Sequence, residues 1–199
     1  ELMEVVERKV KPERMKVNDK VAKEKWWQFI RTRPDLYATI AGCERVLFHA
    51  YVSKYMLFAS LDHSLLFAGP SYVFALDDLF WLPLLQGQVH EVWALSFSSS
   101  LEDRVRYTPT DCFETFPVPL SFLDSTAKES FEDVKQKGLQ DVGERYHKFR
   151  TDLMMGNNEG LTSTYNRFHD PSETNTNHLE LRRLHCEMDQ AVLTTYGWS

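Results

Sequence analysis

The segment from Arg45 to Leu76, "RVLFHAYVSKYMLFASLDHSLLFAGPSYVFAL", decides which fold this chain can adopt. β-Branched and aromatic residues dominate the segment, and the short stretches "DHS" (62–64) and "AGPS" (68–71) interrupt it. Side chains of the first kind favour extended backbone, and breaks of the second kind mark turns. We therefore predict three or four short strands here, arranged as an antiparallel meander.

Helical patterns flank this segment on both sides. Residues 2–24 predict one exposed, highly charged helix, and Pro34 followed by Gly42 predicts a short helix over 34–41. A stripe of apolar residues predicts a helix over 78–95, and further stripes after residue 121 end at Gly197. The predicted fold class is α+β: a small antiparallel or mixed sheet with packed helices, followed by a helical C-terminal subdomain.

Length and composition limit the classes of protein that fit. A chain of 199 residues can form one sizeable core, or one core with a helical appendage. No apolar run approaches the roughly 20 residues of a membrane span, and three widely spaced cysteines give no disulfide framework. We expect a cytoplasmic protein that does not contact a membrane. Because the chain starts without Met, inside a helical pattern, we also expect it to be a piece of a longer polypeptide.

Charge is distributed unevenly along the chain. Residues 1–54 hold 12 Lys and Arg against 8 Asp and Glu, a net charge of +4. Residues 55–103 hold no Lys or Arg and 6 acids, although the formal charge of the whole chain is only −6. A polyanionic partner therefore fits only if one basic surface forms within an acidic protein.

The stretch "SSSLEDRVRYTPTDCFETFPVP" (98–119) is the best candidate for such a surface. It sets three serines beside Arg104 and Arg106, and hydroxyl and guanidinium groups together suit phosphate. "RVRY" predicts a strand. Alternatively, Asp111 and Glu114 neutralise the two arginines. The aromatic and proline residues of the stretch are predicted to lock it into the core: Phe113, Phe116, Pro117 and Pro119.

Motifs for catalysis are incomplete in this sequence. It holds no glycine-rich phosphate or cofactor loop and no Asn-Pro-Pro-Tyr motif for a target amine. The acid-x-Lys pairs at 7–9 and 133–135 lie in helical patterns, and His90-Glu91 lacks the second His of a metalloprotease helix. We predict no catalytic site, no metal site and no bound cofactor in this chain.

Four quoted blocks carry a resemblance to a known family: "KWWQFIRTRPDLYATIAGCERVLFHAYVSKYMLFA", "LLQGQVHEVWALSFSSSLEDRVRYTPTDCFETFPVP", "GLTSTYNRFHDP" and "LRRLHCEMDQAVLTTYGW". They resemble the C-terminal part of large bacterial adenine-N6 DNA methyltransferases of restriction–modification and phage-defence systems, including fused methylase–endonuclease polypeptides. "RYTPTDCFETFP" and "TYNRFHDP" are the most specific parts of the match.

This resemblance implies a domain plan and a set of partners. Residues 1–25 would connect to an upstream methylase domain, 26–120 would form the target recognition domain, and 121–199 its helical support. The parent enzyme would use S-adenosylmethionine, and Mg²⁺ if a nuclease domain exists. The partners would be double-stranded DNA and the methylase domain of the same polypeptide.

The resemblance also implies roles for particular side chains. The candidates for the DNA backbone are Ser98, Ser99, Ser100, Arg104, Arg106 and Thr108, with Lys23, Lys25, Arg31 and Arg33 adding positive potential. The base-reading candidates are Arg45, His49, Ser53, Lys54, His63 and Ser64, and which of them read bases stays open. His49 is either half-buried or directed toward a groove of the DNA.

Two functions from different classes fit these observations. The first is sequence-specific recognition of duplex DNA for a catalytic domain outside this chain. The alternative is a protein-interaction module that docks the methylase to partner subunits through its acidic helices.

Overall fold

The computed structural model describes residues 1–29, 32–101, 104–118 and 131–198, and for 99–101, 104–105 and 131–135 it describes the backbone alone. The chain forms two compact units, Glu1–Ala41 and Gly42–Ser199.

The first unit is helical, but it does not contain the single long helix predicted over 2–24. Pro12 stands in the first turn of a second helix, where its missing N–H costs nothing. Asp19 caps a third helix by accepting a hydrogen bond from the Ala22 N–H at 2.9 Å. The short helix predicted over 34–41 is confirmed. The helices are α1 (Leu2–Lys9), α2 (Lys11–Lys16), α3 (Lys20–Glu24) and α4 (Pro34–Ile40).

The second unit contains a three-stranded antiparallel sheet built from β1 (Arg45–Ala50), β3 (Phe58–Asp62) and β4 (Ser71–Phe74). The strand order is β3-β1-β4, so β1 lies in the centre and the predicted meander is wrong. The reason is that β4 pairs with β1, and not with β3 as in a meander, and the segment between β1 and β3 joins neither strand. Instead β2 (Val52–Ser53) leaves to join a second sheet.

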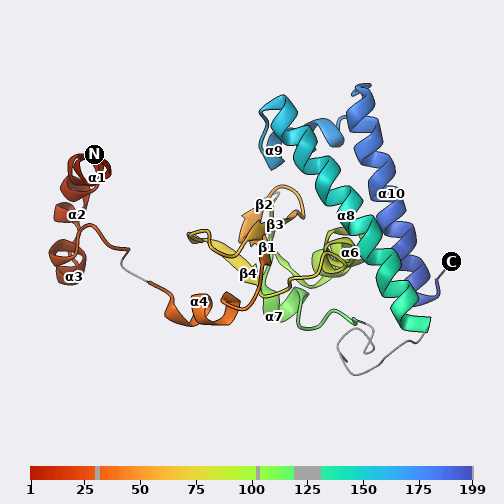
Figure 1. Ribbon diagram of the computed structural model, residues 1–199, viewed down its shortest axis with the longest axis horizontal. Coiled ribbons are helices and arrows are strands. Elements are labelled where there is room, and N and C mark those ends of the chain that lie inside the picture. The colour runs from red at the N-terminus through yellow and green to blue at the C-terminus, as the bar shows by residue number, and fades with distance from the viewer. Residues whose placement is uncertain (30–31, 102–103, 119–130, 199) are drawn as a thin grey trace. The chain divides into compact units, whose positions relative to one another are not determined.

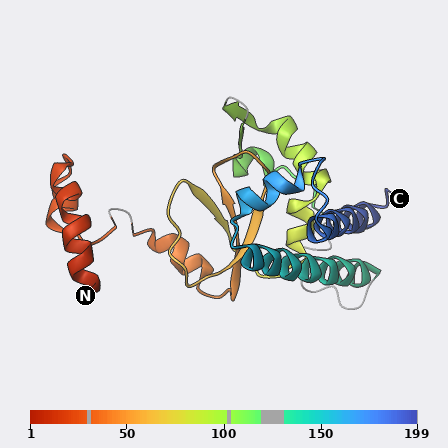
Figure 2. The ribbon, with the colours of Figure 1, turned by 90° about the horizontal axis from the view of Figure 1, so that it is seen from above.

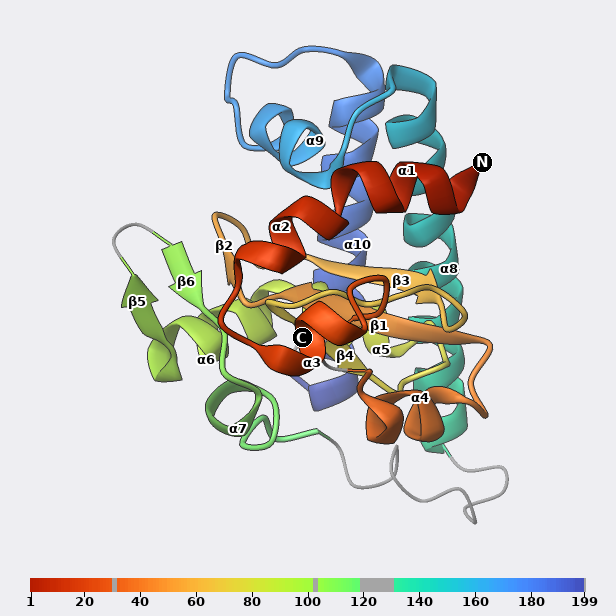
Figure 3. The same ribbon diagram turned by 90° about the vertical axis from the view of Figure 1, so that its left-hand side faces the viewer.

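This second sheet has the order β2-β6-β5, with β5 at Ser99–Leu101 and β6 at Arg104–Arg106. All its pairs are antiparallel, and Arg106 lies opposite both Val52 and Ser99. The strand predicted at "RVRY" is therefore confirmed. Figure 3 shows β5 and β6 together at one margin of the second unit, beside α6.

The helix predicted over 78–95 is two helices, α5 (Trp81–Gln86) and α6 (Gln88–Phe97). The break falls at Gly87, whose backbone is extended, with φ −71° and ψ 162°. A Cβ at Gly87 would lie 2.6 Å from the Pro83 carbonyl oxygen and 3.1 Å from Asp189 Oδ1. Glycine permits this close approach between α5, α6 and the C-terminal helix. A short helix, α7 (Pro109–Cys112), follows β6.

Two long helices, α8 (Phe131–Asn157) and α10 (Thr176–Tyr196), run antiparallel side by side, joined through α9 (Leu161–Phe168) (Figures 1 and 2). The apolar stripe predicted on α10 is confirmed as buried, and Gly197 ends the helix in the left-handed region at φ 72°. Its members are Leu181, Leu184, Met188 and Val192.

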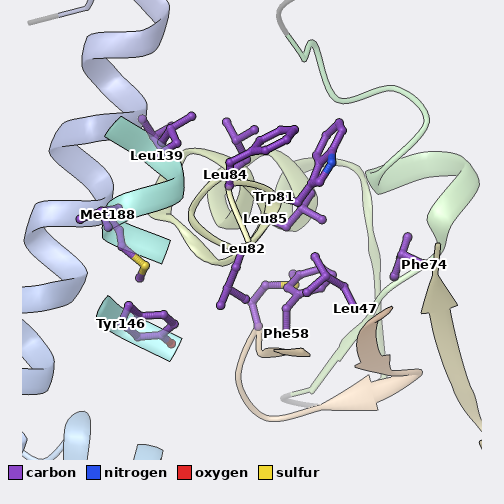
Figure 4. Packing of buried hydrophobic residues seen from close by; sticks show 14 of the residues in the cluster. Leu47, Phe58, Phe74, Trp81, Leu82, Leu84, Leu85, Leu139, Tyr146 and Met188 are labelled. Carbon is purple, nitrogen blue, oxygen red and sulfur yellow. The ribbon is translucent and has the colours of Figure 1, made fainter. Parts of the chain in front are cut away.

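One hydrophobic core joins these elements of the second unit. Leu47 and Phe58 reach it from the sheet, Leu82 from α5, Tyr146 from α8 and Met188 from α10 (Figure 4). The α+β fold class is thus confirmed. Among the described residues, no helix combines the length and the apolar composition needed to cross a bilayer.

A buried polar chain runs through this core. Arg150 donates to the Phe58 carbonyl at 2.7 Å and to the Tyr146 hydroxyl at 2.8 Å. The Tyr146 and Tyr165 hydroxyls hydrogen-bond to each other, and the Tyr165 hydroxyl lies 2.8 Å from His185 Nε2. Burial raises the pKa of both tyrosines and lowers the pKa of His185 to about 3. This network of hydrogen-bonded side chains connects β3, α8, α9 and α10.

Candidate nucleic-acid interface

Arg106 is the last residue of β6, the central strand of the second sheet. Its side chain is exposed, and its guanidinium carbon lies 5.0 Å from the centre of the Tyr51 ring. Tyr51 in turn lies against Tyr72, with ring centres 5.6 Å apart. A guanidinium stacked on an aromatic ring keeps its N–H groups directed outward in its own plane, so it is pre-oriented for an anion or a base edge.

Tyr107, the next residue, anchors this strand in the core. Its side chain is fully buried, and its hydroxyl lies 3.3 Å from His90 Nε2. Burial raises the pKa of Tyr107 and lowers the pKa of His90 to about 4. Because successive strand residues point to opposite faces, burying Tyr107 presents Arg106 to solvent.

Lys54 lies in the turn after β2 and is held by α9. Its Nζ donates to Asn166 Oδ1 at 2.9 Å, and the Tyr55 hydroxyl donates to the same oxygen at 2.9 Å. His169 stacks on Tyr55 with ring centres 4.5 Å apart. The "VSKY" turn and the "TYNRFHDP" block therefore meet, and Lys54 is an exposed residue whose ammonium group is held by Asn166 and lies over the Tyr55 ring.

Three other base-reading candidates lie at the opposite end of β1, about 17 Å along the strand from Ala50. Arg45 Nε donates to Ser60 Oγ at 2.7 Å, and Arg45 faces a pocket of about 610 Å³ between β3 and α8. His63 and Ser64 follow β3 on an exposed turn, where Ser64 N and Oγ donate to Asp62. The candidates thus form two groups instead of one cluster.

His49 takes the buried alternative. Only 2% of it is exposed, its ring stacks on Phe58, and Nδ1 lies 2.8 Å from the Leu57 carbonyl oxygen. Burial lowers its pKa to about 4. A side chain in this position does not reach the groove of a DNA duplex.

The remaining candidates are placed only in part. Ser98 and Thr108 are partly exposed beside β5 and β6. Ser53 lies in β2 and pairs with Val105 of β6. The Arg31 position and the side chains of Ser99, Ser100 and Arg104 lie outside the described residues. Exposed Lys23, Lys25 and Arg33 belong to the first unit, so their predicted common surface with Arg106 stays a prediction.

The aromatic residues after β6 have the structural role predicted for them. Phe113 packs on Phe74 with ring centres 4.9 Å apart, and Phe116 packs on His90 at 4.7 Å. Phe116 is only 5% exposed. Pro119 lies outside the described residues. These contacts fix the segment after α7 against the core.

Comparison with known proteins gives one informative result. No family model and no curated protein matches the chain. Among solved structures, the whole chain superposes on part of MmeI, a Type IIL restriction-modification enzyme solved in complex with DNA, with a TM-score of 0.67. The chain has the fold of one part of MmeI. Sequence identity is 19%, and the match covers 100% of this chain but 24% of MmeI, so the likeness concerns the fold of about a quarter of that enzyme.

Proposed function

We propose that this chain is the duplex-recognition module of a bacterial adenine-N6 DNA methyltransferase of a restriction–modification system. The single observation that carries the proposal is the fold shared over the full chain with MmeI, an enzyme solved in complex with DNA. The exposed, ring-stacked Arg106 supports it, because it supplies the kind of cation that such a module requires.

The proposed mechanism divides the work between two parts of a longer polypeptide. A methylase must extrude its target adenine from the stack, and other residues must hold the duplex in register meanwhile. In this chain Arg106, at the end of β6, and Lys54, in the turn after β2, would contact DNA, and Ser98 and Thr108 would add hydroxyl donors. His63 and Ser64, at the far end of β1, would reach a different part of the duplex.

The cofactors of such an enzyme do not fit this chain. S-Adenosylmethionine needs a glycine-rich loop, and the eight glycines are dispersed along the sequence. Within the part of the chain that the structure describes, no three His, Cys, Asp or Glu side chains converge to hold a metal ion. We therefore assign S-adenosylmethionine, and Mg²⁺ for any nuclease step, to the rest of the polypeptide.

A titration of a fluorescent duplex with the chain tests the proposal. Because the chain is acidic overall, we expect a weak dissociation constant of roughly 10⁻⁴ to 10⁻⁶ M. A surface that neutralises about three phosphates would lose about 40-fold in affinity between roughly 50 and 200 mM salt. Undetectable binding at the lower salt concentration would favour the alternative, a protein-docking module. An Asn-Pro-Pro-Tyr motif in upstream coding sequence would support the methylase assignment.

A further inference from the structure

A second surface of the chain is mostly apolar and lacks Lys and Arg, unlike the surface around Arg106. Helices α6 and α10 line an apolar groove of about 580 Å³. Three large hydrophobic residues that line it are exposed to solvent: Val92 is 59% exposed, Phe97 53% and Trp198 60%. Contiguous exposed hydrophobic residues of this size mark an interaction surface. The lining residues are Gln88, Val89, Val92, Trp93, Ser96, Phe97, Asp189, Leu193 and Trp198.

The aromatic walls of this groove are held in place. Trp93 Nε1 donates to Thr115 Oγ1 at 3.1 Å, and Phe97 lies against Trp93 with ring centres 4.6 Å apart. On the other wall, Trp198 stacks on Tyr196 at 4.8 Å. Rings that are already fixed lose little conformational entropy when a partner binds, which favours binding.

Charge decides what kind of partner fits. The sequence holds no Lys or Arg between 55 and 103, which includes α6, and none between 184 and 199, the second half of α10. Asp189 lies in the groove and accepts a hydrogen bond from the Gln88 N–H at 2.7 Å. Burial raises the pKa of Asp189 and of Glu91, and Asp189 adds to the effect on Glu91. The residues that line the groove are therefore mostly apolar, and they include one carboxylate, Asp189, and no Lys or Arg.

We propose that the α6–α10 groove docks a basic amphipathic α-helix of a partner protein. The 10-residue α6 is about 15 Å long, which matches about three turns of a bound helix with apolar anchors at i, i+3 or i+4, and i+7. A Lys or Arg on the flank of that helix would face Asp189. The lining offers no Lys or Arg to a DNA phosphate, and the same groove of a second copy would offer no cation to Asp189. This binding activity goes beyond duplex recognition.

The test uses the chain and a fluorescent helical peptide of about 14 residues with a leucine stripe and lysines elsewhere. A twin peptide carries glutamate in place of lysine. Val92→Lys puts a cation into the groove, while Leu179→Lys makes the same charge change at a 46% exposed position of α10 outside it. Trp198→Ala removes one exposed ring without changing charge. Circular dichroism checks that each variant folds.

We expect the lysine peptide to bind the unmodified chain at least about tenfold more tightly than its glutamate twin. Val92→Lys and Trp198→Ala should each weaken this binding about tenfold, and Leu179→Lys less than about twofold. Equal losses in the two lysine variants would show nonspecific attraction and overturn the proposal. No binding, or equal binding of the glutamate twin, would also overturn it. So would a chain dimer in sedimentation that Val92→Lys dissociates, since the occupant would then be a second copy.

Discussion

Two arginines of the second unit lie over tyrosine rings at nearly the same distance, yet their surroundings differ completely. Arg150 lies 4.8 Å from the Tyr146 ring and Arg106 lies 5.0 Å from the Tyr51 ring. Arg150 is 3% exposed, and its guanidinium donates to the Phe58 carbonyl and the Tyr146 hydroxyl. Arg106 is exposed at the end of β6, the central strand of a three-stranded sheet.

The difference shows that the pairing itself does not define a role. Inside the core, hydrogen bonds that Arg150 donates to neutral oxygens compensate the cost of burying its charge, so this residue joins β3 to α8. At the end of β6, stacking on Tyr51 orients the Arg106 guanidinium, which solvent or a ligand can reach. The first arginine should therefore affect stability, and the second should affect binding.

We expect a fall in pH to change the free energy of unfolding more than any substitution below. Burial lowers the pKa of His49 and His90 to about 4 and of His185 to about 3, against a usual value of 6.5. The unfolded chain takes up these protons first, so stability is fully present above pH 6.5 and is lost as pH falls toward 4. We expect a loss on the order of 1 kcal/mol per histidine for each pH unit. Urea unfolding at several pH values measures it, and a flat profile from pH 7 to 4.5 would contradict a neutral histidine interior.

Arg150→Met should have the next largest effect. The substitution keeps an unbranched side chain but leaves the Phe58 carbonyl and the Tyr146 hydroxyl without their donor. We expect a loss of roughly 3–5 kcal/mol in the free energy of unfolding, because hydrogen bonds from a charged donor to buried acceptors disappear. Arg145→Met is the matched control, since Arg145 is exposed and pairs with Glu187 at the surface. Equal effects of the two substitutions would remove the distinction between the interior and the surface.

Two glycines of α8 provide a smaller test of the same interior. A Cβ at Gly143 would lie 2.3 Å from the Leu79 carbonyl oxygen, whereas one at Gly138 would meet nothing within 4 Å. Gly143→Ala should destabilise the chain by roughly 1–3 kcal/mol through overpacking. Gly138→Ala should stabilise it by about 0.5–1 kcal/mol through helix propensity. Stabilisation by both substitutions would mean that α8 does not pack this closely on the segment before α5.

The sequence predicted much of the fold because local patterns dominate there. The α10 stripe, the "RVRY" strand and the short helix at 34–40 follow from periodicity and from the conformational limits of proline and glycine. The strand order did not follow, since it depends on β4 pairing with the distant strand β1 instead of with β3. The break at Gly87 also depends on a distant residue, because Asp189 approaches from α10.

The candidate site could be predicted only in part, for a similar physical reason. Residue type pointed to Arg106 and Lys54, but Tyr51 and Asn166, which hold them, come from strand and helix patterns with no sign of that role. His49 looked equally suited to a groove or to the core. Its burial is decided by Phe58 and Leu57, which the sheet register brings beside it.

The most direct measurement is the affinity of a duplex for Arg106→Ala compared with Arg183→Ala, at several salt concentrations. Both variants lose one exposed guanidinium, but Arg183 pairs with Glu180 and Glu187 on α10. We predict that Arg106→Ala loses about 1–3 kcal/mol of binding free energy and keeps its stability, while Arg183→Ala binds like the unmodified chain. A salt slope lower by about one would identify a phosphate contact, and an unchanged slope with relaxed sequence preference would identify a base contact. Equal affinities of the two variants would contradict the placement of DNA against Arg106.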